Sequence, residues 1–371
     1  MNVKRVNGEP DHSSSRFICW SKQSRNALCA AVISVVAMVT AAGAASAAAP
    51  PLPQRLSDTG LFVAGSTSEI APGSVAFSPQ YPLWSDGAQK RRWIALPPGT
   101  FIDAARADAW EFPRGTRLWK EFSVGERVET RFIERLQDGS WRFAAYVWNQ
   151  DRTDAVLVPE EGTTTVAARG RRYAIPAEAD CRACHEGAPV PVLGFSALQL
   201  SSDRDPLAPH AEPATGVDLR SLAARGVLKN LRADLLEQPP RIATASPTER
   251  AALGYLHGNC GHCHSRPDAS GASVPVSVVL AQSVAEPNSA AAVVKSLVGA
   301  PSRFRPLGAQ QATQLVVPGA SHASVMPLRM RSRDARVQMP PLGTDMPDLE
   351  ALALIERWID HSLQQRREPQ P

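Results

Sequence analysis

Two kinds of pattern divide the chain, and the front part is β-rich. Residues 127–133 (RVETRFI) and 141–148 (WRFAAYVW) are rich in β-branched and aromatic residues, and Asp138-Gly139 stands between them. Two such runs around Asp-Gly are the best short-range signal of a β-hairpin. Turn residues at 97–100 and 112–116 separate further short runs, as expected for connected strands. We therefore predict an antiparallel β-rich domain over residues 55–178.

Helical spacing replaces this pattern in the last third of the chain. Ser246-Pro247-Thr248-Glu249 combines a Ser N-cap, a Pro at the first helical position and a Glu three residues after the cap, which predicts that a helix begins there. Between Asp348 and Leu363, apolar residues recur on one side of a second helix. These elements predict an α-helical domain over residues 246–365, so the expected fold class is α+β.

The N-terminus has the pattern of an export signal. Residues 1–25 carry five basic and two acidic residues, residues 27–49 carry no charge, and the run ends on Ala45-Ser46-Ala47. A basic start, an apolar middle and a small-x-small end predict a signal peptide over residues 1–47 and a periplasmic protein. An uncleaved anchor is the alternative, because 23 uncharged residues can span a bilayer. The stretch is only modestly apolar, so we expect cleavage and no stable membrane span.

The charge balance gives no argument for a nucleic-acid partner. The 371 residues include 40 Lys and Arg against 36 Asp and Glu, and removing residues 1–47 leaves 35 against 34. A strong basic patch is the usual electrostatic footprint of nucleic-acid binding, and a balance this close to zero does not supply one. Cleavage also removes Cys19 and Cys29, two of the six cysteines. The four that stay lie in two short motifs.

Both motifs read C-x-x-C-H, at residues 181–185 and 260–264, which is the attachment signature of c-type haem. Two thiols one helical turn apart can add to the two vinyl groups on one porphyrin edge, and the next residue, His, supplies a nitrogen to iron. The alternatives are zinc and disulfides. The 75 residues between Cys184 and Cys260 exceed the roughly 15–20 usual between paired zinc ligands. Disulfides leave the His after each pair unexplained.

We therefore predict two covalent haem c groups, each with its iron. The thioether cysteines are Cys181, Cys184, Cys260 and Cys263, and the first iron ligands are His185 and His264. Residues 179–245 form the expected first haem-binding segment, and the second haem belongs to the helical domain at 246–365.

The sixth ligand of the second haem has a clear candidate in Met339. It stands in Gln338-Met339-Pro340-Pro341-Leu342-Gly343, between the two expected helices. A Met in an extended, Pro-stiffened loop is how small cytochrome c domains present a thioether to iron. We therefore expect His264 and Met339 to form an axial pair in a class I cytochrome c-like domain. The alternative is that Met339 only packs in its loop.

The sixth ligand of the first haem stays open on these residues. No methionine occurs between Met38 and Met326, so none near His185 in sequence can supply a thioether. Three possibilities remain for this ligand: a Met from the second domain, a His, or no protein ligand. His210 follows a Pro-rich, linker-like stretch and is expected to be solvated.

The chain also resembles a family of bacterial periplasmic dihaem c-type cytochromes catalogued as conserved hypothetical proteins. The resemblance rests on the combination of the haem motifs with residues 56–62 (LSDTGLF), 81–88 (YPLWSDGA), 129–149 and 339–343 (MPPLG). It implies a haem-binding electron-transfer protein. Members carry an Arg-Met pair before the Met-Pro-Pro loop, matched here by Arg329-Met330, so the resemblance implies Met330 as the ligand of the first haem. Gly261 stands where members commonly have Ala, which should not affect haem attachment.

Two functions fit these observations. The first is electron transfer between periplasmic redox partners such as an oxidase, a dehydrogenase or a reductase. The second is a dihaem redox enzyme of peroxidase type, with an open or displaceable sixth position on the first haem. Peroxidase chemistry needs an acid/base residue above the open iron, and no such residue can be assigned here. We therefore expect an electron carrier more than a catalyst.

Overall fold

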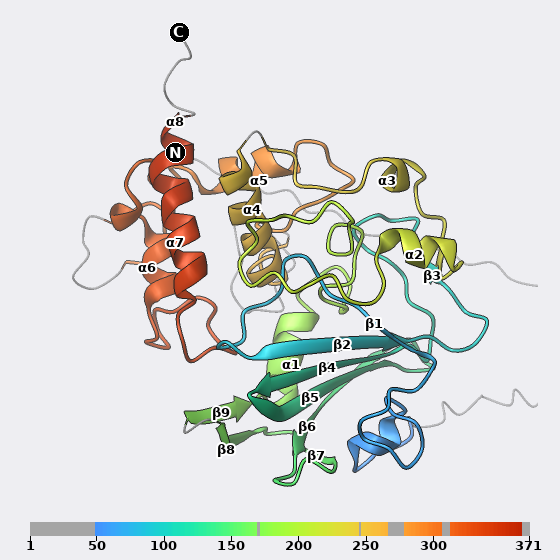
Figure 1. Ribbon diagram of the computed structural model, residues 1–371. Helices are drawn as coiled ribbons and strands as arrows, with labels where there is room; N and C mark the ends of the chain where they lie inside the picture. The colour runs from blue at the N-terminus through green and yellow to red at the C-terminus, as the bar shows by residue number, and fades with distance from the viewer. Residues whose placement is uncertain (1–48, 169–170, 245, 266–277, 306–311, 366–371) are drawn as a thin grey trace, which may run out of the picture. The chain divides into compact units, whose positions relative to one another are not determined.

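An antiparallel six-stranded sheet forms the front of the described chain in the computed structural model (Figure 1). The structure describes residues 49–168, 171–244, 246–265, 278–305 and 312–365. The sheet order is β1-β2-β4-β5-β6-β7, formed by β1 (Ser74–Ala76), β2 (Gln89–Ala95), β4 (Arg117–Val124), β5 (Glu126–Arg135), β6 (Trp141–Trp148) and β7 (Ala155–Leu157). With the helices below, it confirms the α+β fold class.

The hairpin expected around Asp138-Gly139 is confirmed as β5–β6. Arg135 lies opposite Trp141, and the Leu136 N–H donates to the Ser140 carbonyl at 2.8 Å to close the turn. Gly139 has a φ of +93°, a conformation that side-chain-bearing residues rarely adopt. The turn therefore requires a glycine at position 139, because of its positive φ angle.

The two faces of the sheet are buried in different ways. One face carries large aromatic residues, among them Trp93, Trp119 and Phe132, packed with Leu56 and Leu61 from the segment that precedes the sheet. These aromatics are buried core, as expected for one covered face of an antiparallel sheet. The opposite face packs partly against residues 190–235, whose Phe195 is 2% exposed. The segment after the first motif therefore shares a core with the sheet.

Two smaller strand pairs accompany the sheet. The antiparallel pair is β8 (Thr163–Ala168) with β9 (Arg171–Ile175), and the parallel pair is β3 (Ile102–Asp103) with β10 (Leu228–Lys229). The parallel pair joins a front loop to a segment more than 100 positions later, which ties the segment after the first motif to the sheet domain. The expected signal peptide lies outside the described residues.

Short helices make up the rest of the described chain. They are α1 (Glu178–His185), α2 (Leu219–Ala224), α3 (Asp234–Glu237), α4 (Pro247–Asn259), α5 (Ser289–Leu297), α6 (Val325–Arg331), α7 (Leu349–Arg357) and α8 (Leu363–Gln365), with 3-10 turns at Leu56–Thr59 and Ser321–Ala323 and a π-turn at Trp358–Ser362. Within the described residues, none of these helices has the length and apolarity to cross a membrane.

Both helices expected in the last third of the chain are confirmed. The Ser246 hydroxyl accepts from the Glu249 N–H at 3.4 Å at the start of α4, and the Asp348 carboxylate accepts from the Ala351 N–H at 3.1 Å at the start of α7. The π-turn joins α7 to α8, so helical structure continues to Gln365. Trp358 donates its indole N–H to Glu249 at 3.3 Å, which links the two helices inside one hydrophobic core.

Candidate functional site

The first C-x-x-C-H motif lies on α1, a helix of eight residues. The Ala177 N–H donates to Asp180 at 3.1 Å at its start. Arg182 stabilises the helix through ion pairs with Glu178 and Glu186, one turn before and one turn after it, both at 2.6 Å. Helical spacing puts Cys181 and Cys184 on one face, as covalent attachment to a single ring requires.

The second motif begins where α4 ends. The Cys260 N–H still donates to the Leu256 carbonyl at 2.9 Å, and the His264 N–H donates to the Cys260 carbonyl at 2.9 Å. The motif therefore continues the helix as a tight turn, which keeps both thiols and the histidine close together. Both motifs thus hold two thiols and one imidazole in compact helical geometry.

The structure brings the two motifs into contact, which their separation in sequence did not indicate. The Cys184 and Cys263 thiols are near enough to shift each other's pKa, and the Cys263 sulfur lies 4.0 Å from the Ala183 carbonyl oxygen. The Ser265 hydroxyl donates to the Gly187 carbonyl at 3.0 Å. A Cβ at Gly187 would lie 2.9 Å from the His262 carbonyl oxygen. In Figure 1, α1 lies between the sheet and α4.

Both motif histidines make the same hydrogen bond. His185 Nδ1 lies 2.7 Å from the Pro191 carbonyl oxygen, and His264 Nδ1 lies 3.2 Å from the Val278 carbonyl oxygen. A carbonyl can only accept, so each Nδ1 must carry the proton. In a neutral ring this leaves the lone pair on Nε2, the atom that faces a metal. Metal-ligating histidines are commonly oriented by this kind of bond.

Burial keeps these rings neutral. It lowers the pKa of His185 to about 3 and lowers the pKa of His264 as well. Burial also raises the pKa of Cys181 to about 11 and that of Cys260 to about 12. The site therefore offers two neutral imidazoles beside protonated thiols near pH 7. Among the described residues, no group of three or more His, Cys, Asp or Glu side chains could hold a metal ion by itself.

This donor set fits a haem. Zinc needs several thiolates or imidazoles converging on one point. A covalently attached haem needs only two thiols along one edge and one imidazole from the protein. The porphyrin itself supplies four further nitrogen ligands to the iron. The residues that would hold the two groups are Cys181, Cys184 and His185, and Cys260, Cys263 and His264.

The Met339 loop is connected to the second motif through Arg329. Its N–H donates to the Arg329 carbonyl at 3.0 Å, and the Arg329 guanidinium donates to the Val337 carbonyl at 2.7 Å. Arg329 is also close enough to His264 to add its charge to the burial that lowers the pKa of the ring. The Met loop and the second histidine therefore share Arg329 as a neighbour.

Met330 lies on α6 and is 8% exposed. It belongs to the hydrophobic core that includes Leu256 of α4 and Ile355 of α7. His185 has a different environment, since the Phe143 ring lies 5.3 Å away and Lys120 and Arg131 act on it. Ligation of the first haem by Met330 stays a prediction.

The Trp-Ser-Asp segment holds the second motif and the Met loop together. The Trp84 N–H donates to the Asn259 side chain at 2.6 Å, and Asn259 donates back to the Pro82 carbonyl at 3.2 Å. Asp86 accepts from the backbone N–H groups of Asp345 and Met346 at 2.9 and 3.0 Å. Sequence reasoning missed this role, although the segment itself stood out.

His210 is not the solvated residue that we expected. Its Nε2 lies 2.8 Å from Asp348 and its Nδ1 lies 3.3 Å from Glu350. The Trp84 ring lies 4.7 Å from the imidazole. The prediction failed because the partners come from α7, about 140 positions later, which no local pattern of the Pro-rich stretch reveals.

The ion pair between His210 and Asp348 makes the free energy of unfolding depend on pH. The bond to Asp348 raises the pKa of His210 above 6.5, so this pair stabilises the fold fully below pH 6.5 and is lost as pH rises through the raised pKa. We expect the free energy of unfolding to decline over this window in the wild type and to lose that part of its slope in His210→Gln. Denaturant titrations from about pH 6 to about pH 9 measure it. Exposed His322 supplies the control, and an equal loss of slope in His322→Gln would contradict the assignment.

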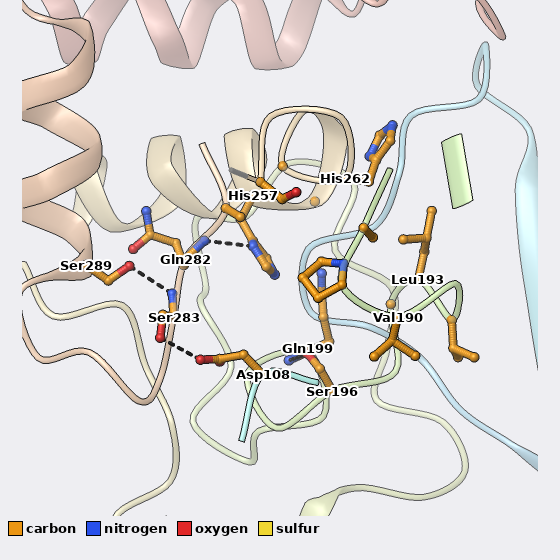
Figure 2. A pocket seen from close by; sticks show the side chains of 18 of the residues that line it. Asp108, Val190, Leu193, Ser196, Gln199, His257, His262, Gln282, Ser283 and Ser289 are labelled. Carbon is orange, nitrogen blue, oxygen red and sulfur yellow. Dashed lines mark hydrogen bonds between the residues drawn. The ribbon is translucent and has the colours of Figure 1, made fainter. Parts of the chain in front are cut away.

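A cavity of about 380 Å³ is lined in part by Gly261 and His262 of the second motif (Figure 2). The Gln282 N–H donates to His257 Nδ1 at 3.0 Å, and Ser283 donates to Asp108 at 2.5 Å. Burial lowers the pKa of His257 to about 4. His257 therefore anchors the 281–283 segment as a neutral ring. None of the predicted cysteine, histidine or methionine ligands lines this cavity.

Comparison with known proteins finds no matching family model, no matching curated protein and no matching solved structure. The function is therefore argued from the residues and geometry of the site.

Proposed function

We propose that the protein is a periplasmic dihaem c-type cytochrome that transfers electrons between redox partners. The observation that carries the proposal is the shared geometry of the two motif histidines. Each follows a pair of thiols, is half-buried and neutral, and donates Nδ1–H to a backbone carbonyl. Two independent segments with the same arrangement favour two equivalent metal ligands over two core histidines.

The chain's own residues account for retention, orientation and shielding. The four motif cysteines hold the two haems by covalent bonds, which keep a cofactor attached outside the cytoplasm. Pro191 and Val278 set the imidazole planes through their carbonyls. Haem supplies a reversible one-electron couple, and a His/Met pair at the second site raises its potential. The contacts of Cys263 with Ala183 and of Ser265 with Gly187 support one dihaem unit instead of two separate centres.

The remaining expectations belong to the same proposal. The order of α4, the second motif, the Met loop and α7 supports a class I cytochrome c-like domain, in agreement with the family resemblance. The export pattern of residues 1–47 supports the periplasm as its location. A periplasmic oxidase, dehydrogenase or reductase would then be the electron-transfer partner.

Haem counting tests the proposal directly. We expect two covalent haems per chain in the exported wild type by pyridine haemochrome assay, and one in Cys181→Ala/Cys184→Ala or in Cys260→Ala/Cys263→Ala. Each double variant removes both attachment points of one haem and leaves the other pair intact. Fewer than two haems in the wild type would refute the proposal, and two haems in either double variant would refute the attachment sites.

Electron paramagnetic resonance of the oxidised protein separates the carrier from the peroxidase-like alternative. A carrier is expected to show two low-spin haems that do not change with hydrogen peroxide. A high-spin ferric haem that turns over peroxide would favour the enzyme. The measurement uses the intact dihaem protein.

A further inference from the structure

Three cations lie side by side on one face of the sheet. Lys120 of β4 is directly opposite Arg92 of β2 and Arg131 of β5 in the strand register. Residues directly opposite each other in an antiparallel pair point to the same face. Like charges in this arrangement are destabilising, so the row needs negative groups to balance it.

Two of the three cations have carboxylate partners. Arg92 pairs with Glu212 at 2.7 Å, and Arg131 makes a two-pronged pair with Glu129 at 2.7 and 3.1 Å. Lys120 forms no ion pair with a described carboxylate, and its amine lies 4.8 Å from the centroid of the Phe122 ring. The buried Nη2 of Arg92, whose residue is 5% exposed, also has no hydrogen-bond partner among the described residues.

The same face receives the first motif. Ala145 of β6 lies opposite Arg131, and Phe143 is two positions along the same strand, so Phe143 points to this face. The Phe143 ring lies 5.3 Å from His185, and Arg182 of α1 lies over it. The charges of Lys120 and Arg131 also act on His185. Lys120 and Arg131 therefore border the place where the first haem would attach.

We propose that Arg92, Lys120 and Arg131 form a binding site for the propionate carboxylates of the first haem. The inference rests on the proposed function and adds a role for the β-rich domain. A haem carries two propionates, and a carboxylate taken out of water needs a cation with free donors. The Lys120 amine has no carboxylate partner among the described residues, and Arg92 has a free donor. The sheet is then part of the cofactor site, and the row tunes the potential of the haem that it holds.

Potentiometry on the intact dihaem protein tests the site with two substitutions that should shift the midpoint potential in opposite directions. Lys120→Gln removes a positive charge, which makes adding an electron less favourable, so one of the two midpoint potentials should fall. We expect the ratio of reduced to oxidised haem at fixed ambient potential to drop about tenfold, or about 59 mV for one electron. Glu212→Gln removes a negative charge from the same row and should raise the same potential. Lys120→Arg should keep it near the wild-type value.

The control is Lys229→Gln on β10, where another lysine lies 5.3 Å from the centroid of an aromatic ring. It should leave both potentials unchanged. Unchanged potentials in Lys120→Gln and Glu212→Gln, with two haems retained, would overturn the inference. A high-spin signal in Lys120→Gln would also overturn it, because the amine would then be an iron ligand. If Lys120→Gln does not fold, Glu212→Gln still decides. Absence of covalent haem in the wild type would instead be a failure of the proposed function.

Discussion

Gly258→Ala is expected to destabilise the protein, because the added methyl group has no room on α4. A Cβ at Gly258 would overlap the carbonyl oxygen of Tyr81, which is backbone and cannot rotate away. The helix would have to move from residues 81–84 and strain the Trp84–Asn259 bond beside Cys260. Overpacking costs about 1–3 kcal/mol and a strained buried hydrogen bond about 1 kcal/mol more. The helix gains only about 1 kcal/mol from Gly to Ala.

The net expectation is therefore a loss of about 1–3 kcal/mol in the free energy of unfolding. Urea titration of the holoprotein measures it. Gly73→Ala is the matched control, because a Cβ there meets no atom within 4 Å. A loss equal to that of the control would show that residues 81–84 do not pack on α4 as described.

Met339→Ala is expected to abolish the low-spin His/Met signature of one haem. Without the thioether, the second iron loses its sixth ligand, so its near-infrared thioether band should disappear and its potential should fall. Absorption and electron paramagnetic resonance spectra of the dihaem protein measure both. Met346→Ala is the control, since that side chain is 37% exposed. An unchanged spectrum in Met339→Ala would remove Met339 as a ligand.

Met330→Ala tests the remaining ligand prediction in the same spectra. If Met330 binds the first iron, the other haem should lose its thioether signature while the Met339-dependent one stays. Because Met330 is buried in the core, Met330→Leu provides a variant of similar volume that cannot ligate. A first haem unaffected in both variants would leave another residue as its sixth ligand.

Local signals predicted the elements that position the site. The cap at Ser246 and the Asp-Gly turn specify structure within four residues, so each could be recognised without knowing its surroundings. The apolar spacing between Asp348 and Leu363 likewise indicated a helix on its own. His210 shows the opposite case. Its local context is a polar, Pro-rich stretch, and the carboxylates that hold it lie on α7.

The sequence by itself predicted the attachment chemistry, because two thiols and a histidine within five residues form a local pattern that can be read without the fold. Only the tertiary structure decided that the two motifs touch, that Pro191 and Val278 orient the histidines, and that Arg92, Lys120 and Arg131 border the first motif. These arrangements depend on strand register and on packing between segments far apart in the chain. Such long-range pairing is set by the free energy of the whole fold, which no short pattern encodes.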